Sequence, residues 1–240
     1  QTGLNVNKLL EEPTAAAIYY AFEGGLKLNG NYAIYDLGGS TFDVSIIKAE
    51  GIRINMVASE GVQKLGGEDF DVILQKLVTE KFNDENDEVI DEQDYTITDA
   101  EEDKKSLTKR ENINVRIHRK NLLITRAEFE ENISSLVTQT EMLCELILNE
   151  HNLTAEEIQE VFLVGGSTRV PLVQQAVERV FKKKPIQSVN VDKAVVLGAS
   201  IYAALKPVQS KPLVQQKSVN KILEQSQDDN SSEIDKWLVD

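Results

Sequence analysis

The stretch that decides the fold runs from Tyr32 to Ile47 and reads YAIYDLGGSTFDVSII. A mostly apolar run, 32–36, leads into a pair of glycines, and from Thr41 onward apolar and polar residues alternate. Such alternation is typical of a strand with one buried face. A third alternating run, 52–58, follows a turn at Glu50-Gly51. The pattern therefore predicts three strands that pair in succession as a meander.

The string GGST occurs twice, at residues 38–41 and again at 165–168, each time directly after an apolar strand-like run. Paired glycines at the end of a strand let the backbone turn tightly and bring its N–H groups close to a ligand. The neighbouring hydroxyls add donors, so the pattern suits a phosphate or a nucleotide. Two ordinary glycine turns are the plainer alternative. Neither copy is a P-loop or a dinucleotide-binding fingerprint, because the chain contains no GxxxxGK[ST] and no GxGxxG.

Strand and helix signals alternate along the rest of the chain, which predicts an α/β or α+β domain. A hairpin with its turn at Arg119-Lys120-Asn121 is expected, and Thr125 and Glu128 have the spacing of a capping box. The Leu and Ile residues around Cys144 indicate a buried, unreactive cysteine. The other expected elements are helices at 13–22, 68–82, one ending near 110, 126–149, 171–181 and 193–205, and a buried strand at 161–164.

Composition excludes several classes of protein. The 240 residues hold 40 acidic and 26 basic side chains, a net charge of -14, so neither nucleic acid nor a membrane surface is an expected partner. No apolar run reaches the roughly 18 residues of a spanning helix. A single cysteine excludes an intrachain disulfide and favours the cytoplasm or another reducing compartment, and with two histidines it cannot build a zinc site of the usual ligands. The chain begins with Gln1 and shows no leader pattern, so we expect a piece of a longer protein.

Four motifs resemble the heat shock protein 70 (DnaK-type) chaperone family in order and spacing: EPTAAA at 12–17, DLGGSTFD at 36–43, LGGEDFD at 65–71 and LVGGSTRVP at 163–171. The resemblance covers about residues 3–205 and implies an actin-like ATPase fold, of α/β class with a ribonuclease H-like motif, in which two lobes surround a nucleotide cleft. Its C-terminal part would be present here.

The resemblance also implies a division of the chain. It assigns 1–25 and 187–205 to the first lobe, 26–65 and 134–186 to the base of the second lobe, and 66–133 to its tip. Residues 206–240 match no part of the family, and their Gln, Ser, Asn and Asp content predicts a disordered or weakly helical tail.

The family's roles carry over residue by residue. Asp36 and Glu12 would act on Mg²⁺ through water, the Thr41 hydroxyl would face the terminal phosphate, and Asp43 would help orient the attacking water. The implied cofactors are ATP or ADP with Mg²⁺. The implied nucleotide-binding residues are Gly38, Gly39, Ser40 and Thr41 at the phosphates, Gly67, then Glu101, Lys104, Lys105 and Thr108 at adenine and ribose, Gly165, Gly166, Ser167 and Arg169 in an adenosine-side loop, and Asp192. Implied partners of the intact protein are a J-domain protein, a nucleotide exchange factor and unfolded clients.

Each role has a plainer alternative. Glu12 could be a charge that favours the start of a helix, and Asp36 and Asp43 could be ordinary strand-end acids. Lys104 and Lys105 could be solvated, since they follow a segment, 84–103, with 11 acids and no base. Arg169 could be a surface residue. For the whole chain, a non-catalytic nucleotide-binding or protein-interaction domain of the same fold, or an unrelated acidic scaffold, are the alternatives.

The chain departs from the family pattern at several positions. Ser40 stands where the family has a third glycine, Val191 where proline is usual and Lys193 where an acid is usual, while the expected tip is strongly acidic. No residue matches the family's first phosphate loop or its catalytic lysine. The resemblance therefore implies an ATP-hydrolysing chaperone module that is incomplete as an ATPase in this chain alone.

Overall fold

The structure is a computed structural model that describes residues 9–51, 53–86 and 88–205. The predicted tail, 206–240, lies outside the described residues. Among the helices of the described residues, none combines the length and apolar character needed to cross a membrane.

A four-stranded sheet forms the centre of the fold, with the strand order β3-β2-β1-β6. Strands β1 (Asn29–Leu37), β2 (Thr41–Glu50) and β3 (Arg53–Gln63) pair antiparallel in succession, which confirms the predicted meander. Strand β6 (Ile158–Val164) pairs parallel to β1. Because β6 lies parallel beside β1, the two glycine pairs that follow these strands emerge at the same edge of the sheet.

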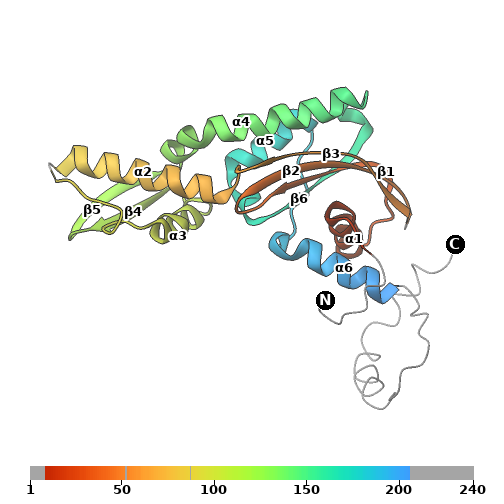
Figure 1. The fold of residues 1–240 in the computed structure, drawn as a ribbon, viewed down its shortest axis with the longest axis horizontal. Coiled ribbons are helices and arrows are strands. Elements are labelled where there is room, and N and C mark those ends of the chain that lie inside the picture. The colour runs from red at the N-terminus through yellow and green to blue at the C-terminus, as the bar shows by residue number, and fades with distance from the viewer. Residues whose placement is uncertain (1–8, 52, 87, 206–240) are drawn as a thin grey trace, which may run out of the picture. The chain divides into compact units, whose positions relative to one another are not determined.

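Helices cover both faces of this sheet (Figure 1). Helix α4 (Arg126–Glu150) packs with α5 (Pro171–Phe181) and against β2 and β3, while α1 (Glu12–Gly24) packs on the opposite face. Alternation explains this layering in β2, where Phe42, Val44 and Ile46 are fully buried.

Helix α6 (Ala194–Leu205) follows a short 3₁₀ turn, Val191–Lys193, and packs against α1. The two helices cross closely because both present small side chains, Ala15 in α1 and Gly198 in α6. A Cβ added at Gly198 would lie 1.7 Å from the carbonyl oxygen of Ala15. Only glycine therefore permits this crossing.

The remaining elements form a second layer beyond the sheet edge (Figure 1). They are α2 (Gly67–Asn86), α3 (Ile97–Leu107) and the hairpin of β4 (Asn112–Ile117) and β5 (Lys120–Thr125). Helix α2 begins one residue before the predicted 68–82 helix and runs four residues beyond it. The helix predicted to end near Arg110 ends at Leu107.

The hairpin turn differs from the prediction. The strands are joined by His118 and Arg119, both with positive φ (46° and 67°), so Lys120 already belongs to β5 and pairs with Ile117. Two-residue hairpin loops favour positive φ at both positions because that twist matches the strands. The sequence does not predict a turn at these two positions, since neither residue is Gly or Asn. His118 is instead held by its ring, which lies 2.7 Å from a carboxylate oxygen of both Glu88 and Asp94.

Candidate functional site

Hydrogen bonds join the two glycine pairs through one carbonyl. The oxygen of Gly38 accepts from the amide of Gly67 at 3.0 Å and from the hydroxyl of Ser167 at 2.8 Å. The amide of Glu68 donates to the carbonyl of Gly39 at 2.7 Å. Three segments that are far apart in the sequence, 38–39, 66–68 and 165–168, are therefore fixed to one another at this sheet edge.

Close backbone approach explains several of the glycines. A Cβ at Gly66 would lie 2.4 Å from the carbonyl oxygen of Gly39, and a Cβ at Gly67 would lie 2.5 Å from the hydroxyl of Ser167. Gly165 has φ +87°, and its Cβ would lie 2.2 Å from the carbonyl oxygen of Leu37. Side chains at these positions would push the segments apart.

The turn between β1 and β2 leaves two amides available. Gly38 donates to the carbonyl of Thr41 at 3.0 Å, but within the described part of the chain no hydrogen bond uses the amides of Gly39 and Ser40. Gly39 and Ser40 are both exposed. Ser40 is absent from the non-glycine residues with positive φ, so a side chain at this third position introduces no backbone strain. Adjacent free amides in a turn form a small anion-binding concavity.

A pocket of about 690 Å³ opens beside this turn. It brings together most of the sequence-predicted nucleotide residues: Gly38, Gly39, Gly67, Glu101, Lys104, Lys105, Thr108, Gly166, Ser167, Arg169 and Asp192. The predicted residues that do not line it are Glu12, Asp36, Ser40, Thr41, Asp43 and Gly165. The pocket also has walls that the sequence did not indicate: Glu68, Asp71, Ile97, Thr98, Lys109 and Val170.

Helix α3 forms one wall of the pocket. Its N-terminus is capped by Thr96, whose side chain accepts from the amide of Asp99 at 3.2 Å, a capping box that was not predicted. The two lysines of this helix behave differently. The Lys105 side chain is 53% exposed and pairs with Glu101 and Glu102 at 2.9 and 2.8 Å, as expected for a solvated helix residue. Lys104 contradicts that reading, because it is buried and its ammonium lies 2.7 Å from a carboxylate oxygen of Asp71.

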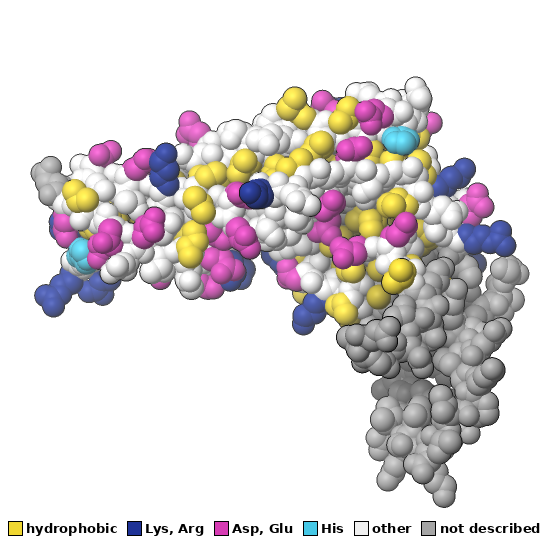
Figure 2. Space-filling model, in the orientation of Figure 1, with side chains coloured by type: hydrophobic (Ala, Val, Ile, Leu, Met, Phe, Trp, Pro, Cys, Tyr) yellow, Lys and Arg dark blue, Asp and Glu magenta, His cyan; other side chains and the backbone are white. Residues whose placement is uncertain are grey.

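Arg169 and Asp192 face each other at another wall. The guanidinium of Arg169 donates to the carbonyl of Val189 at 2.8 Å and lies 3.3 Å from the Asp192 carboxylate. Its side chain is 39% exposed, so a planar cation lies open to the pocket. Figure 2 shows acidic side chains gathered around α3 and basic side chains at the tip of the hairpin.

The segment that carries Asp192 is anchored to α1. Tyr20 donates to the carbonyl of Leu163 at 2.5 Å and accepts from the amide of Ser188 at 3.0 Å. The hydroxyls of Tyr19 and Ser188 lie 2.7 Å apart. Burial raises the pKa of Tyr20 to about 12, which keeps its hydroxyl protonated and able to donate. Helix α1 and the Asp192 segment are thereby linked.

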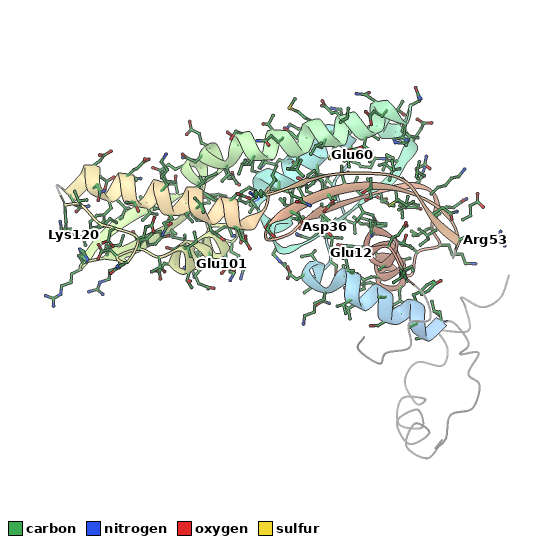
Figure 3. All side chains as sticks on the ribbon, viewed as in Figure 1. Glu12, Asp36, Arg53, Glu60, Glu101 and Lys120 are labelled. Carbon is green, nitrogen blue, oxygen red and sulfur yellow. The ribbon has the colours of Figure 1, made fainter. Side chains whose placement is uncertain are left out.

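Three acids lie where α1 begins and the β1–β2 hairpin closes. Asp36 and Asp43 are direct cross-strand partners, and Glu12 and Asp36 lie at the same end of the sheet in Figure 3. Burial, together with the charges of Asp43 and Glu12, raises the pKa of Asp36 to about 6. The pKa of Asp43 is also raised, by burial and by Glu12. Like charges directly opposite in a hairpin are destabilising, so this cluster has a cost to stability.

Comparison with known proteins shows which family the chain resembles. A model of the Hsp70 protein family matches residues 1–220. The chain is 41% identical over 202 residues to chaperone protein HscA of Buchnera aphidicola, covering 83% of this chain and 32% of that protein. It is 42% identical over 212 residues to the HscA homolog of Histophilus somni, covering 88% and 33% of the two chains. The HscA of Proteus mirabilis is 40% identical over 214 residues, with 88% and 34% covered.

The chain thus spans about a third of the length of these curated relatives. A match over most of this chain at such identity, together with a family model that covers residues 1–220, identifies the family. The chain belongs to the Hsp70 protein family and has its actin-like ATPase fold.

Proposed function

We propose that this chain carries the second-lobe side of an adenine-nucleotide site in an Hsp70-type chaperone. The observation that carries the proposal is the pocket of about 690 Å³ in which both glycine-pair segments, helix α3 and Asp192 converge. Free amides at Gly39 and Ser40 suit phosphate oxygens. The exposed planar guanidinium of Arg169 suits stacking on a base.

The positions of these groups suggest how the nucleotide is oriented in the pocket. We place the phosphates at the β1–β2 turn, where the Thr41 hydroxyl would face the terminal phosphate. The adenosine would extend between α3 and the second glycine pair, toward Glu101, Lys105, Thr108 and Arg169. Phosphoryl transfer depends on positioning and on charge stabilisation, and the hydrogen bonds that lock 38–39 to 66–68 supply that positioning.

The acids at the sheet edge fit Mg²⁺ held through water. Asp36 and Asp43 face each other across the hairpin, and among the described residues no basic side chain forms an ion pair with either of them or with Glu12. Within the same residues no group of three His, Cys, Asp or Glu side chains is close enough to ligate a metal directly. Carboxylates that act through water suit Mg²⁺, which retains several waters and neutralises phosphate charge when it is bound. Asp36 and Glu12 would hold that water shell, and Asp43 would orient the attacking water.

The whole protein's activity is a further part of the proposal. Relatives named chaperone protein HscA support a molecular chaperone. We extend this proposal to ATP hydrolysis and to work with a J-domain protein, an exchange factor and unfolded clients. The single cysteine favours the cytoplasm or another reducing compartment. Contact between α1 and α6 supports placing 1–25 and 187–205 in one lobe. In this division 26–65 and 134–186 form the base of the other lobe, and 66–133 its tip.

Calorimetry with Mg·ADP tests the proposed site. We expect saturable binding with a dissociation constant between about 1 μM and 1 mM, because this chain offers one side of the nucleotide site. Arg169→Ala should weaken binding by about tenfold, since it removes the cation that faces the base. The matched control is Arg179→Ala, which removes an exposed arginine paired with Glu141 on α4 and should leave binding unchanged. Absence of saturable binding at several millimolar ADP, or an equal loss in both variants, contradicts the proposal.

A further inference from the structure

Lys104 is the predicted nucleotide-binding lysine whose ammonium is buried and engaged by partners outside its own helix. It lies 2.7 Å from a carboxylate oxygen of Asp71 and donates to the carbonyl of Gly67 at 2.8 Å. The residue is only 9% exposed, and Asp71 is 5% exposed. A buried ammonium with a carboxylate and a carbonyl partner at these distances is held in place, since uncompensated burial of either charge is costly.

The carbonyl that accepts from Lys104 belongs to Gly67, which also forms a hydrogen bond to the β1–β2 turn. Gly67 uses its amide to donate to the carbonyl of Gly38, at the first residue of the phosphate-facing turn. The following amide, from Glu68, donates to the carbonyl of Gly39. Lys104 therefore connects to the turn through a single peptide segment, 67–68.

We propose that Lys104 is a positioning residue: held by Asp71, its ammonium fixes the carbonyl of Gly67 and, through the amides of residues 67–68, sets the turn at Gly38–Gly39 that receives the phosphates. The ion pair also ties α3 to the start of α2, so the adenosine wall and the phosphate turn keep a constant separation. The binding readout of this inference rests on the proposed nucleotide function.

Lys105 provides the contrasting neighbour. It lies on the same helix and lines the same pocket, but its side chain is 53% exposed and pairs only with the α3 acids Glu101 and Glu102. A residue that touches adenosine should affect adenosine and ADP alike. A residue that sets the phosphate turn should affect ADP much more than adenosine, because adenosine lacks phosphates.

The test measures the affinity of Lys104→Met for Mg·ADP and for adenosine. We expect ADP binding to weaken at least about tenfold and adenosine binding less than about threefold. Lys105→Met should weaken both ligands by similar factors. Lys76→Met, which removes an exposed lysine of α2, controls for the loss of one positive charge. Equal losses of ADP and adenosine affinity in Lys104→Met would overturn the proposal.

A second readout needs no nucleotide. Amide hydrogen exchange of Gly67 and Glu68, followed by NMR, should accelerate at least about tenfold in Lys104→Met because both hydrogen bonds to the turn weaken. Unchanged exchange of both amides overturns the positioning role. If the wild-type chain binds neither ligand, the proposed function fails while this measurement still decides the role of Lys104.

A double variant guards against simple misfolding, since Lys104→Met leaves the Asp71 carboxylate buried without its partner. In Asp71→Asn/Lys104→Met both charges are removed together, and the chain should fold. We expect the selective loss of ADP affinity and the faster exchange at Gly67 to persist in this variant. If ADP affinity and the exchange rate at Gly67 both return to wild-type values, the hydrogen bond from Lys104 to Gly67 does not position the turn, which contradicts the proposal.

Discussion

Asp36 shows at the scale of one residue how a buried acid beside other acids lowers stability. Its carboxyl is partly buried at the end of β1, directly across from Asp43, and its pKa is raised to about 6. The causes are burial first, then the charges of Asp43 and Glu12. In the unfolded chain the same group has a pKa near 3.9. Between these two values folding must take up a proton at Asp36.

This pKa predicts how stability depends on pH. The folded state is favoured while Asp36 is neutral, so its contribution is present below about pH 4 and is lost as the pH rises through 6. Asp36→Asn mimics the neutral acid and should raise the stability of the nucleotide-free chain at pH 8 by about 1–2 kcal/mol, after allowance for solvent screening. Thermal unfolding followed by circular dichroism at pH 8 and pH 4 measures this. A stabilisation of the same size at both pH values would contradict the assigned cause.

At the scale of elements, helices α1 and α6 pack closely because residue 198 has no side chain. Gly198 leaves α6 free to lie against the backbone of α1 at Ala15, and Tyr19 and Tyr20 of α1 in turn anchor Ser188 before the pocket residue Asp192. The helix pair is therefore part of what positions that wall.

Substitution of Gly198 by Ala shows whether helix propensity or the packing of α6 against α1 has the larger effect on stability. In an isolated helix this change stabilises by about 1 kcal/mol, because alanine is the better helix former. Here the added methyl meets the carbonyl of Ala15, so we expect a net loss of about 2–3 kcal/mol. Urea unfolding measures whether the free energy of unfolding of Gly198→Ala falls or rises. Ala199→Ser, at the exposed neighbouring position, should change stability by less than about 0.5 kcal/mol, and a stabilised Gly198→Ala chain would show that the helices do not cross as described.

At the scale of the whole described unit, one hydrophobic core runs from the central sheet into the α2–α3–hairpin layer. The same cluster of buried residues contains Phe42 of β2, Phe82 of α2 and Ile124 of β5. No boundary in this cluster separates the layer from the sheet, so the two should unfold together.

Phe82→Ala tests this cooperativity. Phe82 is fully buried in the outer layer, and its truncation should cost about 3–5 kcal/mol. We expect one transition at lower denaturant, with tyrosine fluorescence and circular dichroism coinciding. Val72→Ala, at a position of the same helix that is 56% exposed, serves as the control. Two separate transitions in Phe82→Ala would show that the outer layer is an independent unit.

The strands, most helices and the two glycine-pair turns could be predicted from the sequence, because period-2 alternation and capping residues act locally. The capping box of Thr125 and Glu128 is confirmed for this reason, with the Glu128 carboxylate 2.8 Å from the amide of Thr125. The buried Cys144 is confirmed as well. The resemblance to the family's motifs predicted most of the residues that line the pocket, because the order and spacing of those motifs match in this chain.

Tertiary structure alone decided what depends on contacts between distant segments. The partner of Lys104 is Asp71, 33 positions earlier, and no local pattern marks that pair because burial of a charge depends on which helices meet. The hairpin turn at His118 and Arg119 was misplaced for the same reason, as its histidine is held by Glu88 and Asp94 from another segment. The raised pKa of Asp36 likewise needs the register that sets it opposite Asp43. Local sequence determines backbone form, whereas charge states and side-chain partners follow from packing across the chain.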